Sequence, residues 1–179
     1  TGWFSELNNP RNTAYFLPIL TAWMIKLIAS PEQGIGMSKD QAENRTDREE
    51  LKEVIKAFLD KYHGPKVGPG KTRVQKLVFF ADLYALHEYG HRITDAEFEP
   101  FHHGSYAEEI SDILEQSDDI KSFDTRKAQY PKFKNLEEPK LSEKKLKIVD
   151  DIFQVTKRMK DKELEVSSKG SWLYENTEF

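Results

Sequence analysis

The chain has 179 residues and a net charge of -4, which excludes a strongly basic nucleic-acid-binding protein but leaves room for a local basic patch. It contains no cysteine, which excludes disulfides, a thiolate zinc site and a cysteine nucleophile, and we expect a cytoplasmic protein. Eleven Phe, seven Tyr and three Trp provide large side chains for a hydrophobic core.

An apolar run lies near the N-terminus. Residues 14–29 read AYFLPILTAWMIKLIA, which is shorter than the roughly twenty residues needed to span a bilayer and includes Pro18 and Lys26. We therefore predict a buried helix that begins near Pro18, and no membrane span. Docking of this run on a partner or on a second copy of the chain is one alternative, and contact with a membrane surface is another.

Two helices are predicted on either side of a rigid break. The first follows a polar linker at residues 31–45, begins at a capping box opened by Thr46 and extends to about residue 62. Residues 68–70 (Gly-Pro-Gly) form the break and the predicted domain boundary. The second helix, from about residue 72 to 89, is indicated by apolar side chains at helical spacing. These are Val74, Leu77, Val78, Ala81, Tyr84 and Ala85.

The second helix ends in His87-Glu88-Tyr89-Gly90-His91, which contains the H-E-x-x-H signature of zinc peptidases. In such a site two His one turn apart bind the metal, which requires a helix that continues through both. Gly90 stands where a left-handed residue usually ends a helix, so His91 would leave the face that carries His87. We therefore predict a helix end, with no metal and no cofactor. A zinc-dependent hydrolase using His87, Glu88 and His91 is kept as an alternative.

Shorter elements follow this helix. Residues 97–102 alternate polar and aromatic side chains around a proline, which indicates an edge strand or extended segment. A capping box opened by Ser105 predicts a helix that extends to about residue 116. Residues 120–123 predict a short strand.

The C-terminal part is predicted to contain a loop and a long helix. Residues 126–134 (RKAQYPKFK) form the loop, and Ser142 begins a helix that extends to about residue 160. The side chains that this helix would bury are Leu146, Val149, Ile152, Phe153 and Val155. Together these elements predict a mainly α fold: a compact helical domain with a short β-ribbon, plus an N-terminal helical extension.

The basic loop offers a second functional alternative. Its four cations and two aromatic rings could contact nucleic acid by charge and stacking, although a solvated loop is the simpler interpretation. A nucleic-acid-binding regulator would use this loop together with Lys66, Lys71 and Arg73.

Several segments together resemble one known family. Residues 71–84 (KTRVQKLVFFADLY) resemble the opening helix of the SocA-like antitoxins, the Panacea domain, which typically reads KLQKLLYFA. Residues 89–94 (YGHRIT) resemble the family's yGrpit element, and residues 98–110 (FEPFHHGSYAEEI) resemble its aromatic, Gly-Pro-Val and helix segment. Residues 141–155 resemble the late helix, and Ser171-Trp172 resembles the terminal stretch that ends in Trp.

The resemblance covers residues 70–179 and implies a Panacea-like domain, with residues 1–69 as an N-terminal addition of apolar arm, linker and helix. It implies a protein that neutralises a cognate toxin by direct binding, with no catalytic residue. The chain departs from the family pattern at Ser105, which stands in place of a Pro.

The predicted partner-binding surface combines aromatic side chains with turn residues, a composition typical of interface centres. Its residues are Phe98, Phe101, His102, His103, Gly104, Tyr106 and Trp172. Among them we expect Phe101 to contribute to the core, and His102 and His103 to be exposed. A homo-oligomer formed through the apolar helix at residues 14–29 is kept as a possible second association.

Overall fold

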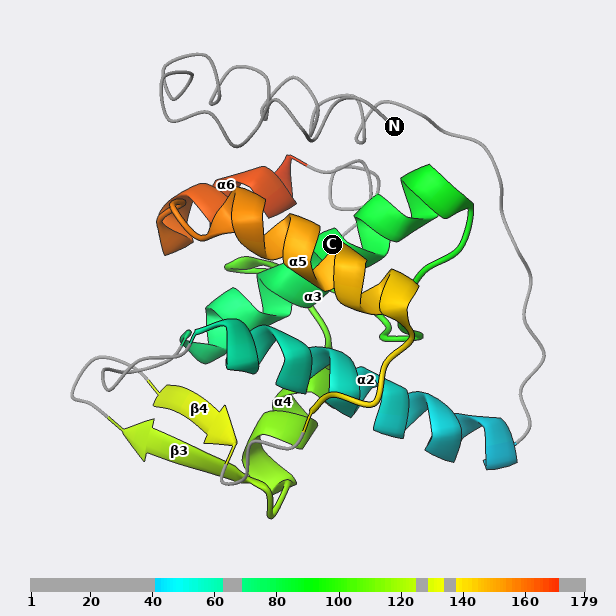
Figure 1. Cartoon of the computed structure of the whole chain (residues 1–179). Coiled ribbons are helices and arrows are strands. Elements are labelled where there is room, and N and C mark those ends of the chain that lie inside the picture. The colour runs from blue at the N-terminus through cyan, green and yellow to red at the C-terminus, as the bar shows by residue number, and fades with distance from the viewer. Residues whose placement is uncertain (1–40, 63–68, 125–128, 134–137, 171–179) are drawn as a thin grey trace.

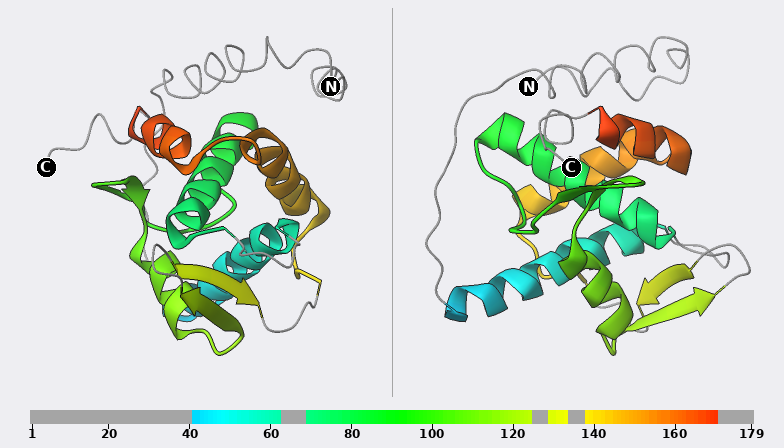
Figure 2. Two further views of the ribbon diagram at one scale, coloured as in Figure 1. Left: turned by 90° about the vertical axis from the view of Figure 1, so that its left-hand side faces the viewer. Right: turned by 180° about the vertical axis from the view of Figure 1, so that it is seen from behind.

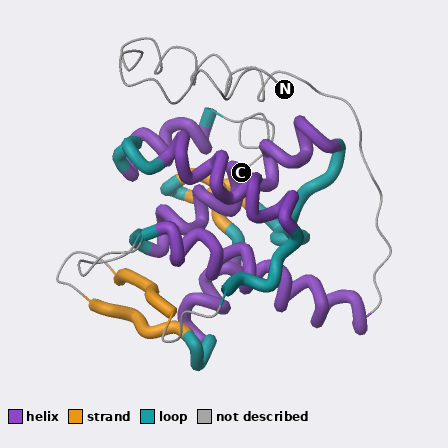
Figure 3. The backbone as a smooth tube through the Cα atoms, viewed as in Figure 1, coloured by secondary structure: helices purple, strands orange, loops and turns teal. Residues whose placement is uncertain are grey.

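The structure is a computed structural model, and it describes residues 41–62, 69–124, 129–133 and 138–170 (Figure 1). Within these residues it contains five helices and two separate antiparallel ribbons of two strands each (Figure 3). The helices are α2 (Gln41–Lys61), α3 (Lys71–Tyr89), α4 (Glu108–Gln116), α5 (Glu143–Thr156) and α6 (Asp161–Lys169). The strands are β1 (Glu99–Phe101), β2 (Gly104–Tyr106), β3 (Ile120–Asp124) and β4 (Gln129–Phe133). The prediction of a mainly α fold with short β structure is confirmed.

Helix α3 lies at the centre of the molecule and packs against α2, α4, α5 and α6 (Figures 1 and 2). Twelve of its 19 residues are buried, so its polar side chains need partners inside the protein. Four buried polar side chains belong to it: Arg73, Gln75, Lys76 and Asp82. Each of the four binds backbone groups outside α3, and together they connect α3 to three segments of the chain around the core.

Helix α2 belongs to the same hydrophobic core as α3. Its buried apolar side chains are Leu51, Val54, Ile55, Ala57, Phe58 and Leu59. The helix begins at Gln41, so the start predicted at Thr46 is wrong. Gln, Ala and Glu are good helix formers, and residues 41–43 extend the helix upstream of the capping box. The domain boundary predicted at residue 70 stays a prediction. Helix α2, which precedes this boundary, packs against α3, which follows it.

The long helix predicted from Ser142 to about residue 160 is two helices. Ser142 caps the start of α5 as predicted. The helix ends at Thr156, where the Arg73 side chain binds backbone carbonyls and stabilises a turn before α6. Leu146, predicted as buried, is 36% exposed because it stands at the margin of the apolar face.

The backbone at residues 104–107 is extended. Ser105, predicted to cap a helix, lies in β2 opposite Pro100 of β1. Helix α4 begins later, at Glu108, after the extended residue Ala107. The capping-box prediction is wrong because side chains of α3 bind this backbone in the extended conformation, which local sequence does not reveal.

The second ribbon pairs β3 with β4, from Ile120 opposite Phe133 to Asp124 opposite Gln129. Strand β3 confirms the strand predicted at residues 120–123. Strand β4 occupies residues 129–133, so the loop prediction is wrong there, because pairing with β3 favours the extended state. Residues 126–128 and 134 of that loop lie outside the described residues. No helix in the described part of the chain is long and apolar enough to cross a membrane.

Candidate partner-binding surface

The β1–β2 ribbon is a hairpin at the surface of the helical domain, next to α6 (Figure 2). Its register pairs Glu99 with Tyr106 and Phe101 with Gly104, which leaves residues 102–103 as the turn. Gly104 follows the turn with a φ of 86°, a left-handed conformation that glycine adopts without steric cost. The hairpin therefore places residues 101–103 at its tip.

An aromatic cluster covers the exposed side of this ribbon. The ring of Phe101 lies with its centroid 5.2 Å from the ring centroids of both His102 and Tyr106. Phe101 is 50% exposed, so the prediction that it contributes to the core is wrong. It stands at the end of β1, next to the turn, and its ring lies against His102 and Tyr106. His102 and His103 are exposed, as predicted.

The remaining predicted residues have different surroundings. Phe98 is partly buried and packs edge-on against Phe79 of α3, with ring centroids 5.2 Å apart, so it supports the ribbon from the core. Gly104 is buried and Tyr106 is half-buried. Trp172 lies outside the described residues.

Two adjacent side chains of α3 bind the backbone of β2 and of the residue that connects it to α4. The Gln75 side-chain amide donates to the Ala107 carbonyl at 2.8 Å and accepts from the Ala107 N–H at 2.9 Å. The Lys76 ammonium donates to the Ser105 carbonyl. Burial lowers the pKa of Lys76 to about 8, because the charged amine loses hydration. Sequence reasoning missed both residues, although two adjacent polar residues inside an apolar helix were a usable signal.

Strand β2 is also in close contact with α6. A Cβ at Gly104 would lie 2.0 Å from Ser168 Oγ, so only a glycine lets β2 lie this close to α6. Nearby, His103 Nδ1 lies 3.6 Å from a carboxylate oxygen of Glu165. Lys169 donates to Glu165 at 2.9 Å, and this bond is the main reason that the pKa of Glu165 is lowered to about 2. The ribbon is thus fixed between α3 and α6.

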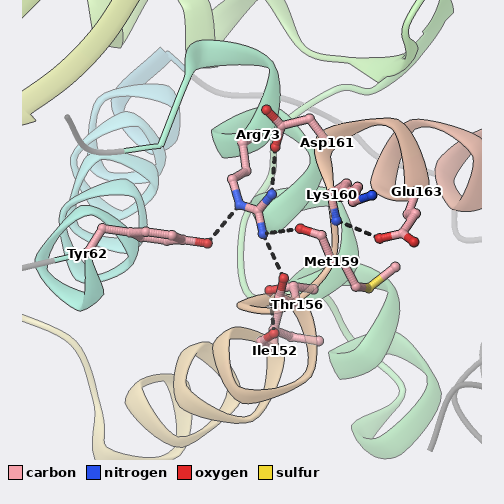
Figure 4. Close-up of polar contacts among 8 residues, drawn as sticks. All are labelled: Tyr62, Arg73, Ile152, Thr156, Met159, Lys160, Asp161 and Glu163. Atoms are coloured by element: carbon pink, nitrogen blue, oxygen red, sulfur yellow. Dashed lines mark hydrogen bonds and ion pairs between the residues drawn. The ribbon is translucent and has the colours of Figure 1, made fainter. Parts of the chain in front are cut away.

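Arg73 connects α3 to the turn between α5 and α6 (Figure 4). Its guanidinium donates to the Tyr62 hydroxyl at 2.9 Å and to the Asp161 carboxylate at 2.6 Å. It also donates to the backbone carbonyls of Thr156 at 2.6 Å and Met159 at 2.9 Å. These carbonyls lie at and just after the C-terminal end of α5, where a helix runs out of its own donors. The Thr156 carbonyl also accepts from the Met159 N–H at 2.9 Å, so Arg73 adds a second donor there.

Asp82 connects α3 to the segment that leads to the ribbon. Its carboxylate accepts from the backbone N–H groups of Ile93 and Thr94 at 3.0 and 2.9 Å, and from the Thr94 hydroxyl at 2.6 Å. Burial raises the pKa of Asp82 to about 6, and the hydrogen bonds from Thr94 act in the opposite direction. The turn after α3 is therefore held by one buried carboxyl group.

The HEYGH segment ends helix α3, as predicted. Gly90 has a φ of 74° and donates its N–H to the Leu86 carbonyl, so the helix closes before His91. The Nδ1 atom of His91 lies 3.0 Å from the Tyr89 carbonyl, while Nδ1 of His87 lies 3.2 Å from Glu88. Within the described ranges, no three His, Asp or Glu side chains are arranged to hold a metal ion. The absence of bound zinc stays a prediction.

Two described cations of the alternative nucleic-acid surface, Arg73 and Lys71, have partners within the protein. Arg73 is buried and engaged with its partners, and Lys71 donates to Glu115 at 2.8 Å. Lys66 lies outside the described residues. Of these cations, none described is both exposed and unengaged.

The sequence itself places the chain in a family. Residues 74–172 match the family described as antitoxin SocA-like, Panacea domain. The match spans more than half of the chain and includes nearly all of α3, the β1–β2 ribbon and helices α4 to α6. The chain therefore belongs to the SocA-like antitoxin family, and α2 precedes the matched residues. No curated protein and no solved structure gives a significant match.

Proposed function

We propose that this protein is an antitoxin that neutralises a cognate toxin by direct binding, and that the toxin contacts the exposed side of the β1–β2 ribbon. The observation that carries the proposal is the aromatic cluster within the family domain, in which Phe101 and His102 are exposed and the half-buried Tyr106 lies against Phe101. Aromatic side chains at the surface are typical of the centres of protein interfaces. Neutralisation then requires no chemistry by the antitoxin, because covering the active surface of the toxin is sufficient.

The ribbon alone is too small for a stable complex. A specific interface buries about 800 Å² on each partner, more than one short hairpin presents. Helix α6 lies beside the ribbon, and its Val166 is 59% exposed. We therefore expect the toxin to contact the ribbon first and the adjoining part of α6 as well.

Co-production of the chain with the protein of its adjacent open reading frame tests the proposal, with growth and calorimetric affinity as readouts. We expect Phe101→Ala, and His102→Ala combined with His103→Ala, to weaken binding at least about tenfold, as loss of an interface anchor does. The melting temperature should change little, because these side chains are exposed.

The matched control is Leu86→Ala, which removes a 46% exposed apolar side chain near the other end of α3. Leu86 is ten residues beyond Lys76, about 15 Å along the helix. This variant should bind as the wild type does. A toxin that binds both ribbon variants with wild-type affinity would move the interface away from the ribbon.

A further inference from the structure

Lys76 has an unusual position for a lysine. It lies in the second turn of the central helix and is 2% exposed. Its ammonium donates to the main-chain carbonyl of Ser105, in the inner strand of the ribbon. Burial of an ammonium group opposes folding unless it is well compensated, so this lysine is a poor choice for stability alone.

The surroundings show what the ammonium contacts. A Cβ at Gly104 would lie 3.3 Å from Lys76 Nζ, so the ribbon backbone passes directly over the amine. The charged groups that act on Lys76 come from α6: Glu165 favours the protonated amine and Lys169 opposes it. The amine therefore lies where α3, α6 and the ribbon meet.

The contact is made to the backbone of β2 and not to a side chain. Among the described residues, the buried Ser105 Oγ has no hydrogen-bond partner. Gln75 binds the next part of the chain, at Ala107, where α4 begins. Lys76 is thus the residue of α3 whose ammonium binds β2, the strand that follows the tip of the hairpin.

We propose that Lys76 is a positioning residue for the partner-binding surface: its ammonium fixes the ribbon against the core, so that residues 101–103 are presented in one orientation. This inference rests on the proposed function, because it assumes that the ribbon contacts the toxin. A buried charge that costs stability but orders a recognition hairpin reduces the conformational freedom that binding would otherwise have to remove.

The test is Lys76→Met, which keeps the length and the apolar stem of the side chain and removes the ammonium. We expect a melting temperature equal to or above that of the wild type. Amide hydrogen exchange in residues 99–107 should become at least tenfold faster, while exchange in α5 stays unchanged. Affinity for the protein of the adjacent open reading frame should fall at least tenfold.

Three further variants make the test specific. Lys56→Met removes another buried lysine, 6% exposed on α2, whose Nζ lies 3.9 Å from Glu53 of the same helix. Ser105→Ala removes the hydroxyl that has no partner. Both should leave exchange in residues 99–107 and toxin affinity unchanged. Lys76→Gln, which keeps a shorter donor, should lie between wild type and Lys76→Met, and it replaces that variant if Met does not fold.

A pH profile supplies a readout that a purely structural role would not change. Wild-type affinity should fall as pH rises through about 8, where Lys76 loses its proton, while the affinity of Lys76→Met should not show this step. Glu165 stays ionised throughout this range because its pKa is about 2.

The outcomes separate this inference from the proposed function. Unchanged exchange in residues 99–107 of Lys76→Met overturns the inference regardless of the toxin. Faster exchange with unchanged affinity also overturns it if Phe101→Ala weakens binding, since the ribbon is then the interface but Lys76 does not position it. If Phe101→Ala has no effect either, the ribbon is not the interface, and the part of the proposed function that places the toxin on the ribbon fails together with this inference.

Discussion

Buried polar side chains of α3 organise the segments around the core of this protein. Arg73 binds the turn between α5 and α6, and Asp82 binds the turn after α3. Both side chains act on backbone groups at the end of a helix or just beyond it, which need partners when they are buried. Replacing Arg73 or Asp82 is therefore expected to destabilise the protein mainly by releasing the segment that the side chain binds. The loss of the side chain's own packing should matter less.

Asp82 makes stability depend on pH. An Asp carboxyl titrates near 3.8 in an unfolded chain, and burial raises the pKa of Asp82 to about 6 in the folded protein. Between these values the folded state binds more protons than the unfolded state. The contribution of Asp82 therefore stabilises the fold as pH falls below about 6, and it is lost as pH rises through that value.

Asp82→Asn tests this titration, because Asn keeps an oxygen that can accept from the N–H groups of Ile93 and Thr94. Between pH 7 and pH 5 we expect the wild type to gain on the order of 1 kcal/mol of unfolding free energy relative to Asp82→Asn. Urea unfolding of both proteins at the two pH values measures the difference. An identical difference at both pH values would show that Asp82 does not titrate in this range.

Arg73 offers a comparison between a buried donor and its exposed partner. Arg73→Met leaves the carbonyls of Thr156 and Met159 without this donor, so we expect the free energy of unfolding to fall by about 1–3 kcal/mol, as for a buried polar group that loses its partner. Asp161, with a side chain 66% exposed, is solvated when its partner changes, so Asp161→Asn should cost less than about 1 kcal/mol. Chemical denaturation measures both, and equal losses would mean that the ion pair, and not the carbonyl contacts, is the important interaction.

At the scale of elements, the β1–β2 ribbon depends on the helices on which it packs. A hairpin of two strands is marginally stable in water by itself. Here α3 binds the backbone of β2, and Gly104 allows the strand to approach α6. Pro100 in β1 also lacks an N–H, which disfavours addition of another strand at that edge. A partner is therefore expected to contact side chains of the ribbon.

The two left-handed glycines should respond differently to alanine. Gly104→Ala adds a Cβ 2.0 Å from Ser168 Oγ at a φ of 86°, so strain and overlap should together cost at least about 2 kcal/mol. Gly90→Ala meets no atom within 4 Å, so only the strain of its φ of 74°, about 1 kcal/mol, is expected. Thermal melts compare the two variants. A larger loss in Gly90→Ala would indicate that α6 moves easily away from the ribbon.

At the scale of the whole molecule, the core is shared between the family domain and the helix before it. Buried side chains of α2 form one cluster with those of α3 to α6, although the family match begins at Val74. A fragment limited to residues 74–172 would lack α2, and the core side chains that pack against α2 would become exposed. A shortened chain should therefore keep α2.

Deletion of residues 1–30 tests the role proposed for the apolar run at residues 14–29. We expect the shortened chain to keep its helical circular dichroism, because α2 to α6 build a core of their own. Association between copies, measured by sedimentation, should decrease, since a long apolar run is a candidate association surface. A shortened chain that is unfolded would show that the deleted residues belong to the core.

The central helix could be predicted from the sequence almost to the residue. Apolar spacing indicated residues 72–89, and the structure has Lys71–Tyr89 with Gly90 as the left-handed end. The helix start predicted from the capping box at Ser105 was wrong. The backbone of Ser105 and Ala107 is held in an extended conformation by Lys76 and Gln75, about thirty residues earlier in the chain. Likewise, the single helix predicted after Ser142 is divided, because Arg73 stabilises a turn that local propensity does not encode.

By itself, the sequence determined the helical class, the end of α3 and the family, because helical periodicity, glycine conformation and motif order are local properties. The tertiary structure alone decided which predicted residues reach solvent. Phe101 is exposed and Phe98 packs inward, since that depends on where α3 and α6 support the hairpin. It also showed the buried lysine beneath the ribbon, because a polar residue inside an apolar helix gains its partner only through contacts between segments distant in the chain.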